Sequence, residues 1–324
     1  MSDNQSKRSV NALTSLVKPE LEYSVVIPTH NRKAKLNNLM RSIENLSHKP
    51  EEVLILDDAS TDGTEDFIHS NFPYVRYFKM EREMWTAFTL SYGIAKARKE
   101  LVYIIDDDNV VDDSSIDPIL EVFGKDSKKE YGVLGPVTCW FKDKDRIMYA
   151  GVTYNKITGV PKGIFENENY IEVNKSSDPD NKNIEVDGIP NAFMLRRSYA
   201  ILAGLIPRYL SFIHDDGYLI YSIKRKLRKR VCVNLDSRIL HDFESYGRLT
   251  DIRLYYTVRN KILFTKEQYP TIRAVINLVF VLSVVAYYVY KAYNQDPKNP
   301  RIKLLLKAFK DGMLNHKSGG PIKW

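Results

Sequence analysis

The chain has little cysteine and no apolar leader at its start. Its 324 residues include two cysteines, Cys139 and Cys232, too few for a disulfide framework or a zinc cluster, which favours a reducing cytosol. Residues 1–20 are polar and lack the apolar core of a signal peptide, so we expect a flexible N-terminal arm. Internal repeats and low-complexity tracts are also missing, which argues against a repeat architecture.

Net positive charge is small outside the C-terminal tail. The chain carries a formal net charge of +7, and residues 291–324 hold eight Lys or Arg against two Asp, a net +6. The first 290 residues therefore sum to about +1, which is ordinary for a soluble body. A nucleic-acid-binding domain needs basic residues on its folded surface, so we expect no nucleic-acid partner.

Strand-length apolar runs alternate with amphipathic stretches of helix length. We expect strands at residues 23–27, 53–56, 74–78 and 101–105, and helices at residues 32–46 and 84–98. This order predicts an α/β fold with a mostly parallel, Rossmann-like sheet flanked by helices.

Polar turns follow three of the expected strands. Asp106–Asp108 follows the fourth strand, Asp57 and Asp58 follow the second, and residues 28–32 follow the first. Ligands of parallel sheets bind beyond the carboxyl ends of the strands, so these turns are expected to meet in one crevice. Adjacent carboxylates repel one another unless a cation or solvent screens them. An acidic turn alone fits a solvated loop equally well; the neighbouring turns favour a cation site.

These motifs, in this order, resemble those of a known family. The donor-side segments are Tyr23–Arg32 (YSVVIPTHNR), Leu56–Thr64 (LDDASTDGT) and Ile105–Asn109 (IDDDN). The acceptor-side segments are Asp187–Arg197 (DGIPNAFMLRR), Phe212–Tyr218 (FIHDDGY) and Ile239–Asp242 (ILHD). Together they resemble family 2 glycosyltransferases of the GT-A fold. Tyr255–Leu263 and Leu304–Gly320 resemble the C-terminal region of membrane-associated, rhamnosyltransferase-like members.

The resemblance implies an inverting, metal-dependent glycosyltransferase that moves a sugar from a nucleotide-sugar donor to a lipid-linked glycan or a surface polysaccharide. It implies Mn²⁺ or Mg²⁺ held by Asp108 and His241, and Asp216 as the catalytic base. The residues implied at the donor are Pro28, Thr29, His30, Arg32, Asp57, Asp58, Asp106 and Asp107. Trp140 and Asp215 are candidates for the acceptor side.

Several of these residues have a structural alternative. Asp57 is as well suited to bond local backbone N–H groups of its turn, and Trp140 to fill the core. If Asp215 and Asp216 lie in an extended segment, only one faces the sugar; alternatively the pair caps a helix expected at residues 218–230.

The whole protein has functional alternatives as well. A catalytically silent nucleotide-sugar-binding or membrane-scaffolding relative is the second function class, although it would have no chemical need for Asp108, Asp216 and His241 together. A nucleotidyltransferase is disfavoured because residues 28–33 contain no glycine for a phosphate loop. Trp85 and Phe88 stand where the family carries an Asn- and Gly-containing stretch, which leaves the donor sugar open.

We expect a donor half at residues 21–110 and an acceptor half at 111–265, followed by a basic, helical, membrane-associating region at 266–324.

Residues 274–290 contain no charge but are short for a membrane span. Residues 302–314 show the pattern of an interfacial helix, with Ile302, Leu305, Leu306, Phe309 and Met313 on one face and lysines opposite. Residues 224–230, with six basic side chains, are either a solvated helix end or a contact for anionic lipid or for a lipid-linked phosphate acceptor. The expected location is the cytoplasmic face of the membrane, bound peripherally or monotopically to an anionic surface. The alternatives are a single span at 274–290 and packing of both helices on the catalytic domain.

Overall fold

The computed structural model describes residues 21–155, 161–210, 215–243, 251–269 and 300–316, with scattered positions between 275 and 294. The expected N-terminal arm at residues 1–20 lies outside this described part.

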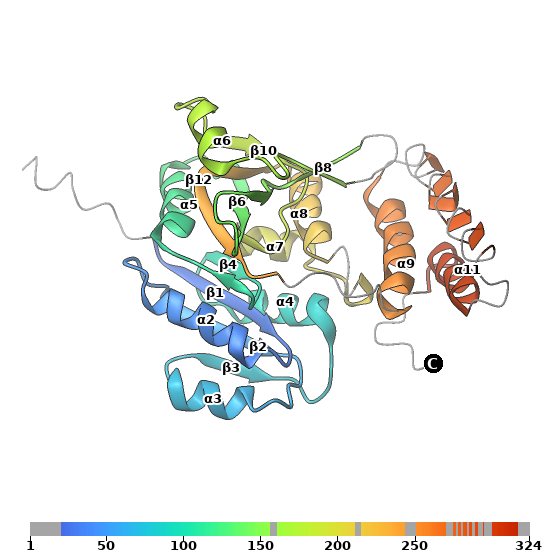
Figure 1. Ribbon diagram of the computed structural model, residues 1–324, viewed down its shortest axis with the longest axis horizontal. Helices are drawn as coiled ribbons and strands as arrows, with labels where there is room; N and C mark the ends of the chain where they lie inside the picture. Colours follow the sequence, from blue (N-terminus) through green and yellow to red (C-terminus); the bar gives the residue numbers. More distant parts are fainter. Residues whose placement is uncertain are drawn as a thin grey trace, which may run out of the picture.

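The N-terminal half alternates strands and helices, and four strands lie parallel in the order β3-β2-β1-β4 (Figure 1). The elements are β1 (Tyr23–Thr29), α2 (Lys33–Glu44), β2 (Glu52–Asp57), α3 (Thr64–Asn71), β3 (Arg76–Lys79), α4 (Trp85–Lys96) and β4 (Leu101–Ile105). The predicted elements are confirmed, with bounds within about two residues, the usual scatter of element ends. Strand β1 continues through Pro28 because its pairing with β4 ends at Val26, so the missing N–H leaves no ladder bond unmade.

Alternate residues of these strands enter two cores, one on each face of the sheet. Val25 and Ile27 of β1 belong to the same buried cluster as Leu39 of α2. Val26, between them, belongs to the opposite cluster, which includes Ile94 of α4. Because side chains alternate across a strand, burying both faces requires the continuous apolar runs seen in the sequence.

The second half makes the sheet mixed, which corrects the expectation of a mostly parallel one. Strand β11 lies antiparallel between β4 and β6, and β12 runs parallel to β6, giving the order β10-β12-β6-β11-β4-β1-β2-β3. The strands added here are β5 (Asn109–Val110), β6 (Tyr131–Trp140), β7 (Ile147–Tyr149), β8 (Val152–Tyr154), β9 (Pro161–Gly163), β10 (Asn183–Glu185), β11 (Ala192–Arg196) and β12 (Arg230–His241). The helices are α5 (Asp113–Lys125), α6 (Tyr170–Ser176), α7 (Arg197–Ala203), α8 (Asp215–Lys226) and the 3-10 turn η1 (Arg208–Leu210).

Two further helices, α9 (Asp251–Gln268) and α11 (Pro300–Met313), lie side by side at one end of the molecule (Figure 1). Helix α11 packs on α9, which itself touches α8 and η1. The predicted apolar face of α11 is divided: Leu305 is buried, whereas Leu306 is 53% exposed. One side of α11 therefore packs within the protein, as the packing alternative expected for both C-terminal helices. Helix α9 supplies an apolar partner for that side, which the sequence alone does not reveal.

Among the described residues, no helix combines the length and the apolar character needed to cross a membrane. The segment considered as a single span, residues 274–290, lies partly outside the described residues.

Candidate functional site

The carboxyl ends of β1, β2 and β4 meet at one edge of the sheet, as the three polar turns predicted. Thr29, the last residue of β1, donates its hydroxyl to Asp107 Oδ2 at 2.7 Å. Both residues are buried. This bond ties the turn after β4 to the end of β1, so the first and third polar turns form a single site.

A short strand brings Asp108 and His241 together. Asn109–Val110 forms β5 directly after the acidic turn and pairs antiparallel with the last two residues of β12, which end in His241. His241 Nε2 lies 3.1 Å from Asp108 Oδ1. The next backbone N–H, that of Asp242, donates to the Asp108 carbonyl at 2.8 Å. The two residues that the resemblance assigned to the metal are therefore neighbours in space.

The pair suits a divalent cation as a partial ligand set. Two ligands on adjacent corners of an octahedron, each about 2.1 Å from the ion, lie about 3 Å apart, close to the observed separation. His241 Nδ1 is buried without a partner among the described residues, so Nε2 is the nitrogen that faces the turn. Within the described ranges no group of three or more His, Cys, Asp or Glu side chains could hold a metal. An ion here would need oxygen ligands from a phosphate or water.

Arg32 closes the other side of the acidic turn. Its Nη1 lies 3.1 Å from Asp107 Oδ1 and 2.9 Å from Asp108 Oδ2. Burial raises the pKa of Asp107 to about 6, although Arg32 and the Thr29 hydroxyl act in the opposite direction. Burial also acts to raise the pKa of Asp108, but the hydrogen bond with His241 and the charges of His241 and Arg32 outweigh it and lower that pKa.

Asp57 and Asp58, predicted together at the donor, differ in role. Asp57 is fully buried and accepts hydrogen bonds from the Ser60 backbone N–H and the Tyr77 hydroxyl. Its carboxylate therefore holds the turn, as the structural alternative proposed. Asp58 accepts the backbone N–H groups of Met84 at 2.6 Å and Trp85 at 2.9 Å.

His30 and Pro28 complete the first polar turn. His30 Nδ1 lies 2.6 Å from the Asp58 carbonyl oxygen, and its ring is partly exposed. Pro28 is buried within β1. The turn after β1 and the turn after β2 are thus joined beside the acidic turn.

Asp215 and Asp216 lie in the first turn of α8, so the expectation of an extended segment is wrong. Burial and the neighbouring charge of Asp215 raise the pKa of Asp216 to about 7, against hydrogen bonds from the backbone N–H groups of Gly217 and Asn191. Burial also raises the pKa of Asp215. A carboxyl with proton affinity near neutral pH suits a general base.

Asn191 connects the acidic turn to Asp216 and was not singled out from the sequence. Its carbonyl accepts the Asp106 backbone N–H at 3.0 Å, and its own N–H is close enough to Asp216 to act against the raised pKa of that carboxyl. Its side chain pairs twice with that of Asn109, at 2.9 and 2.7 Å. The φ of Asn191 is +77°, a region that Asn enters more easily than most residues. The Pro190-Asn191 turn was the only sequence signal for it.

Thr86 is a second residue that the sequence did not indicate. Its hydroxyl donates to Asp215 Oδ2, which links α4 to α8. The preceding Trp85 has φ +66°, unusual for a bulky side chain, and its ring lies 6.5 Å from that of Tyr256 on α9. The start of α4 therefore touches Asp58, the Asp215–Asp216 pair and the C-terminal helices.

Trp140 ends β6 and pairs in register with His241. It is half-buried, its ring lies 6.3 Å from that of Phe243, and its Nε1 is buried without a hydrogen-bond partner among the described residues. This position beside Asp108 and His241 is compatible with the acceptor-side prediction, and the ring also packs as a core residue would.

The basic run at residues 224–230 is largely engaged within the protein. Its internal contacts are Lys224 with Asp187, Lys226 with the Ala203 carbonyl, Lys229 with the Lys129 carbonyl and Arg230 with Glu185. Four of the six basic side chains therefore have partners within the protein and do not require a lipid surface.

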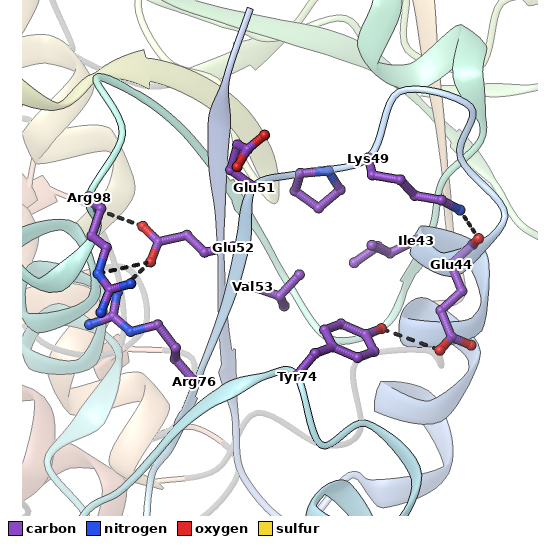
Figure 2. A pocket seen from close by; sticks show the side chains of 10 residues that line it. Ile43, Glu44, Lys49, Glu51, Glu52, Val53, Tyr74, Arg76 and Arg98 are labelled. Atoms are coloured by element: carbon purple, nitrogen blue, oxygen red, sulfur yellow. Dashed lines mark hydrogen bonds and ion pairs between the residues drawn. The ribbon is translucent and has the colours of Figure 1, made fainter.

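A hollow of about 650 Å³ lies at the opposite edge of the sheet, beside the first residues of β2 and β3. Figure 2 shows that its polar groups bond one another: the Glu52 carboxylate with Arg76 and Arg98, the Glu44 carboxylate with the Tyr74 hydroxyl, and the Glu44 backbone carbonyl with Lys49. Since these groups satisfy one another and the acidic turn is at the other edge, this hollow is not the candidate site.

Comparison with known proteins gives a consistent picture. Residues 24–200 match the family described as "Glycosyl transferase family 2". A Poly-beta-1,6-N-acetyl-D-glucosamine synthase of Staphylococcus epidermidis is 28% identical over 118 residues, which cover 36% of this chain and 27% of the synthase. A GalNAc(5)-diNAcBac-PP-undecaprenol beta-1,3-glucosyltransferase of Campylobacter jejuni is 29% identical over 90 residues, covering 26% of this chain and 29% of that enzyme. The matched segments thus span less than a third of either relative.

Solved structures show the same fold. GalNAc-T7, crystallised with UDP, GalNAc and Mn²⁺, aligns with TM-score 0.59 and 16% identity over 90% of this chain and 55% of that one. TarS 1-349 of S. aureus, in complex with UDP-GlcNAc, aligns with TM-score 0.55 and 14% identity over 92% of this chain and 83% of that one.

Proposed function

Because the chain belongs to glycosyl transferase family 2, we propose that it transfers a sugar from a nucleotide-sugar donor to a lipid-linked glycan or a surface polysaccharide. The acceptor class rests on what the matched relatives are named for, a polysaccharide synthase and an undecaprenol-linked glucosyltransferase. The observation that carries the proposal is the 3.1 Å approach of Asp108 to His241 beside the bonded ends of β1 and β4, which gathers the predicted metal ligands at one edge of the sheet.

In the proposed reaction, Asp108 and His241 would hold a divalent cation, Mn²⁺ or Mg²⁺, which would supply neutralisation of the negative charge that develops on the leaving diphosphate. The pair alone leaves coordination positions for diphosphate oxygens and water. Thr29, His30 and Asp58 line the edge of the sheet where the nucleotide is expected.

Asp216 takes the proton of the acceptor hydroxyl. The acceptor oxygen forms a bond to the anomeric carbon as the bond from that carbon to the diphosphate oxygen breaks, which inverts the configuration. The raised pKa of Asp216, about 7, gives the carboxylate the proton affinity that this transfer requires. Thr86 holds the neighbouring Asp215 by its second oxygen, which orients the start of α8.

A screen of nucleotide sugars tests the donor part of the proposal. One donor should raise the unfolding temperature in the presence of Mn²⁺, because a ligand that binds only the native state stabilises it by mass action. The same donor should then support sugar transfer to a lipid-linked or polysaccharide acceptor. Donor stabilisation without transfer to any acceptor would instead favour the catalytically silent relative.

We further propose peripheral binding to an anionic membrane through the C-terminal helices. Exposed apolar side chains occur there at Val275, Ile276, Val279, Leu282, Leu306, Met313 and Leu314. Helix α11 also carries Lys303, Lys307 and Lys310. Leu306→Gln should weaken flotation with anionic vesicles without unfolding the protein, since the side chain is exposed. The matched control is Leu202→Gln, another exposed leucine, on α7, at 69% exposure. Equal flotation of both variants and the wild type would refute this face of α11 as the contact.

A further inference from the structure

Arg32 places its positive charge beside the carboxylates that would also have to balance the charge of the proposed metal ion. Its Nη1 contacts both Asp107 and Asp108, whose side chains are 5% and 10% exposed. Asp108 therefore presents one oxygen to His241 and the other to Arg32. A divalent ion bound by Asp108 and His241 would lie next to the guanidinium, and two cations at such a distance repel each other.

The Arg32 side chain can also move away from the acidic turn. Its side chain is 53% exposed, in contrast to the carboxylates beneath it. It stands just before α2, at a backbone position outside the helix, and no other side-chain hydrogen bond of Arg32 occurs among the described residues. A long, half-exposed side chain that is held only by the acidic turn can rotate to a new anionic partner. A guanidinium binds phosphate oxygens by paired hydrogen bonds.

We propose that Arg32 is a counter-cation that occupies the acidic turn in the absence of donor and moves to the donor's diphosphate when it binds, so that metal binding depends on the nucleotide. This inference rests on the metal site of the proposed function. In the absence of nucleotide, Arg32 pairs with the carboxylates of Asp107 and Asp108, and its charge weakens binding of the metal ion. Once a diphosphate is present, it offers Arg32 a partner and the ion two oxygen ligands. Metal and nucleotide then strengthen each other's binding by the same factor, as linkage requires.

The test measures Mn²⁺ affinity by electron paramagnetic resonance, with and without UDP as the nucleotide probe. The wild type should bind Mn²⁺ weakly alone and much more tightly with UDP. Arg32→Gln should bind Mn²⁺ alone about tenfold or more tightly than the wild type, because a like charge has been removed from beside the ion. Its additional gain from UDP should shrink accordingly.

Lys33→Gln is the matched control. It removes the same charge one residue along, but Lys33 is exposed and bonds the Asp62 carbonyl rather than the acidic turn. Its Mn²⁺ affinity should stay within about threefold of the wild type, since exposed charges at a distance are screened. Equal tightening in Lys33→Gln and Arg32→Gln would overturn the proposal, because net charge alone would explain it.

The outcomes separate this inference from the proposed function. If the wild type binds Mn²⁺ in a UDP-dependent way, Asp108→Asn abolishes that binding and Arg32→Gln changes nothing, the counter-cation role is overturned while the metal site stands. If neither the wild type nor any variant binds Mn²⁺ with UDP present, the metal site itself is overturned, and Arg32 has no ion to oppose.

Discussion

Asp216→Asn should make the protein more stable and less active at the same time. In the folded chain, burial and the Asp215 charge raise the pKa of Asp216 from 3.8 to about 7. When folding raises the pKa of a group, that group contributes its full stabilisation at pH values below its pKa in the unfolded chain. This contribution to the free energy of unfolding is lost as the pH rises to the pKa of the folded chain. The wild type should therefore lose stability relative to the Asn variant between about pH 4 and pH 7, and no further above that.

The size of the effect follows from the pKa difference. A tenfold change in proton affinity is worth about 1.4 kcal/mol, so the full difference corresponds to about 4 kcal/mol. Asp215 shares the titration and both side chains keep some contact with solvent, so we expect about 2–4 kcal/mol between pH 4 and pH 8. Urea denaturation of both proteins at several pH values in this window measures the difference directly.

Activity provides the second readout for the same variant. Transfer should fall by roughly 10²–10⁴-fold, the usual contribution of a general base, while donor binding survives. The wild-type kcat/KM should rise with pH through an apparent pKa near 7. A stability difference that does not change with pH, together with an inflection of kcat/KM near pH 4, would refute the reasoning, because Asp216 would then ionise at no cost. Strong loss in Asp215→Asn and mild loss in Asp216→Asn would assign the base to the neighbour.

Three further outcomes are expected. Asp108→Asn and His241→Ala should each abolish Mn²⁺-stimulated transfer and leave the circular dichroism spectrum unchanged; Mn²⁺ stimulation in either variant would remove that residue from the metal site. Thr86→Val should lower kcat about tenfold, the worth of roughly one hydrogen bond, whereas Thr86→Ser should not; identical kinetics would show that the hydroxyl positions nothing. Asn191→Ala should destabilise the fold by about 1–3 kcal/mol, more than Asn191→Gly, because alanine loses the amide pairing and is strained at φ +77°; the reverse order in urea denaturation would contradict this.

The local pattern of the sequence determined the strands and helices of the first half of the chain. Largely apolar runs of four or five residues mark β1, β2 and β4, and the spacing of Leu36, Leu39 and Ile43 marks α2. These signals suffice because each depends on neighbours within one turn or one strand. Since parallel strands align their carboxyl ends, the meeting of the three polar turns followed as well.

The C-terminal helix shows where local pattern is insufficient. The sequence of α11 has apolar residues around more than one side, and both Leu305 and Leu306 are compatible with an apolar face. Tertiary packing decides that Leu305 is buried, against Ile262 of α9 and against Val281 and Val285, and that Leu306 is exposed. The domain boundaries and the membrane contact remain predictions for the same reason.

Contacts between distant residues decided the rest of the site. Asp108 meets His241 across 133 residues, Thr86 meets Asp215 across 129, and each contact exists only because strands or helices from both halves are adjacent. The position of Asp216 in a helix, the bond between Asp106 and Asn191 and the pairing of Arg32 with the acidic turn also depend on contacts between distant residues. The sequence alone determined which residue types carry the chemistry and which strand ends hold them, since both are local properties. Their mutual distances, burial and proton affinities were decided by the tertiary structure, because electrostatic and hydrogen-bond energies depend on neighbours in space rather than along the chain.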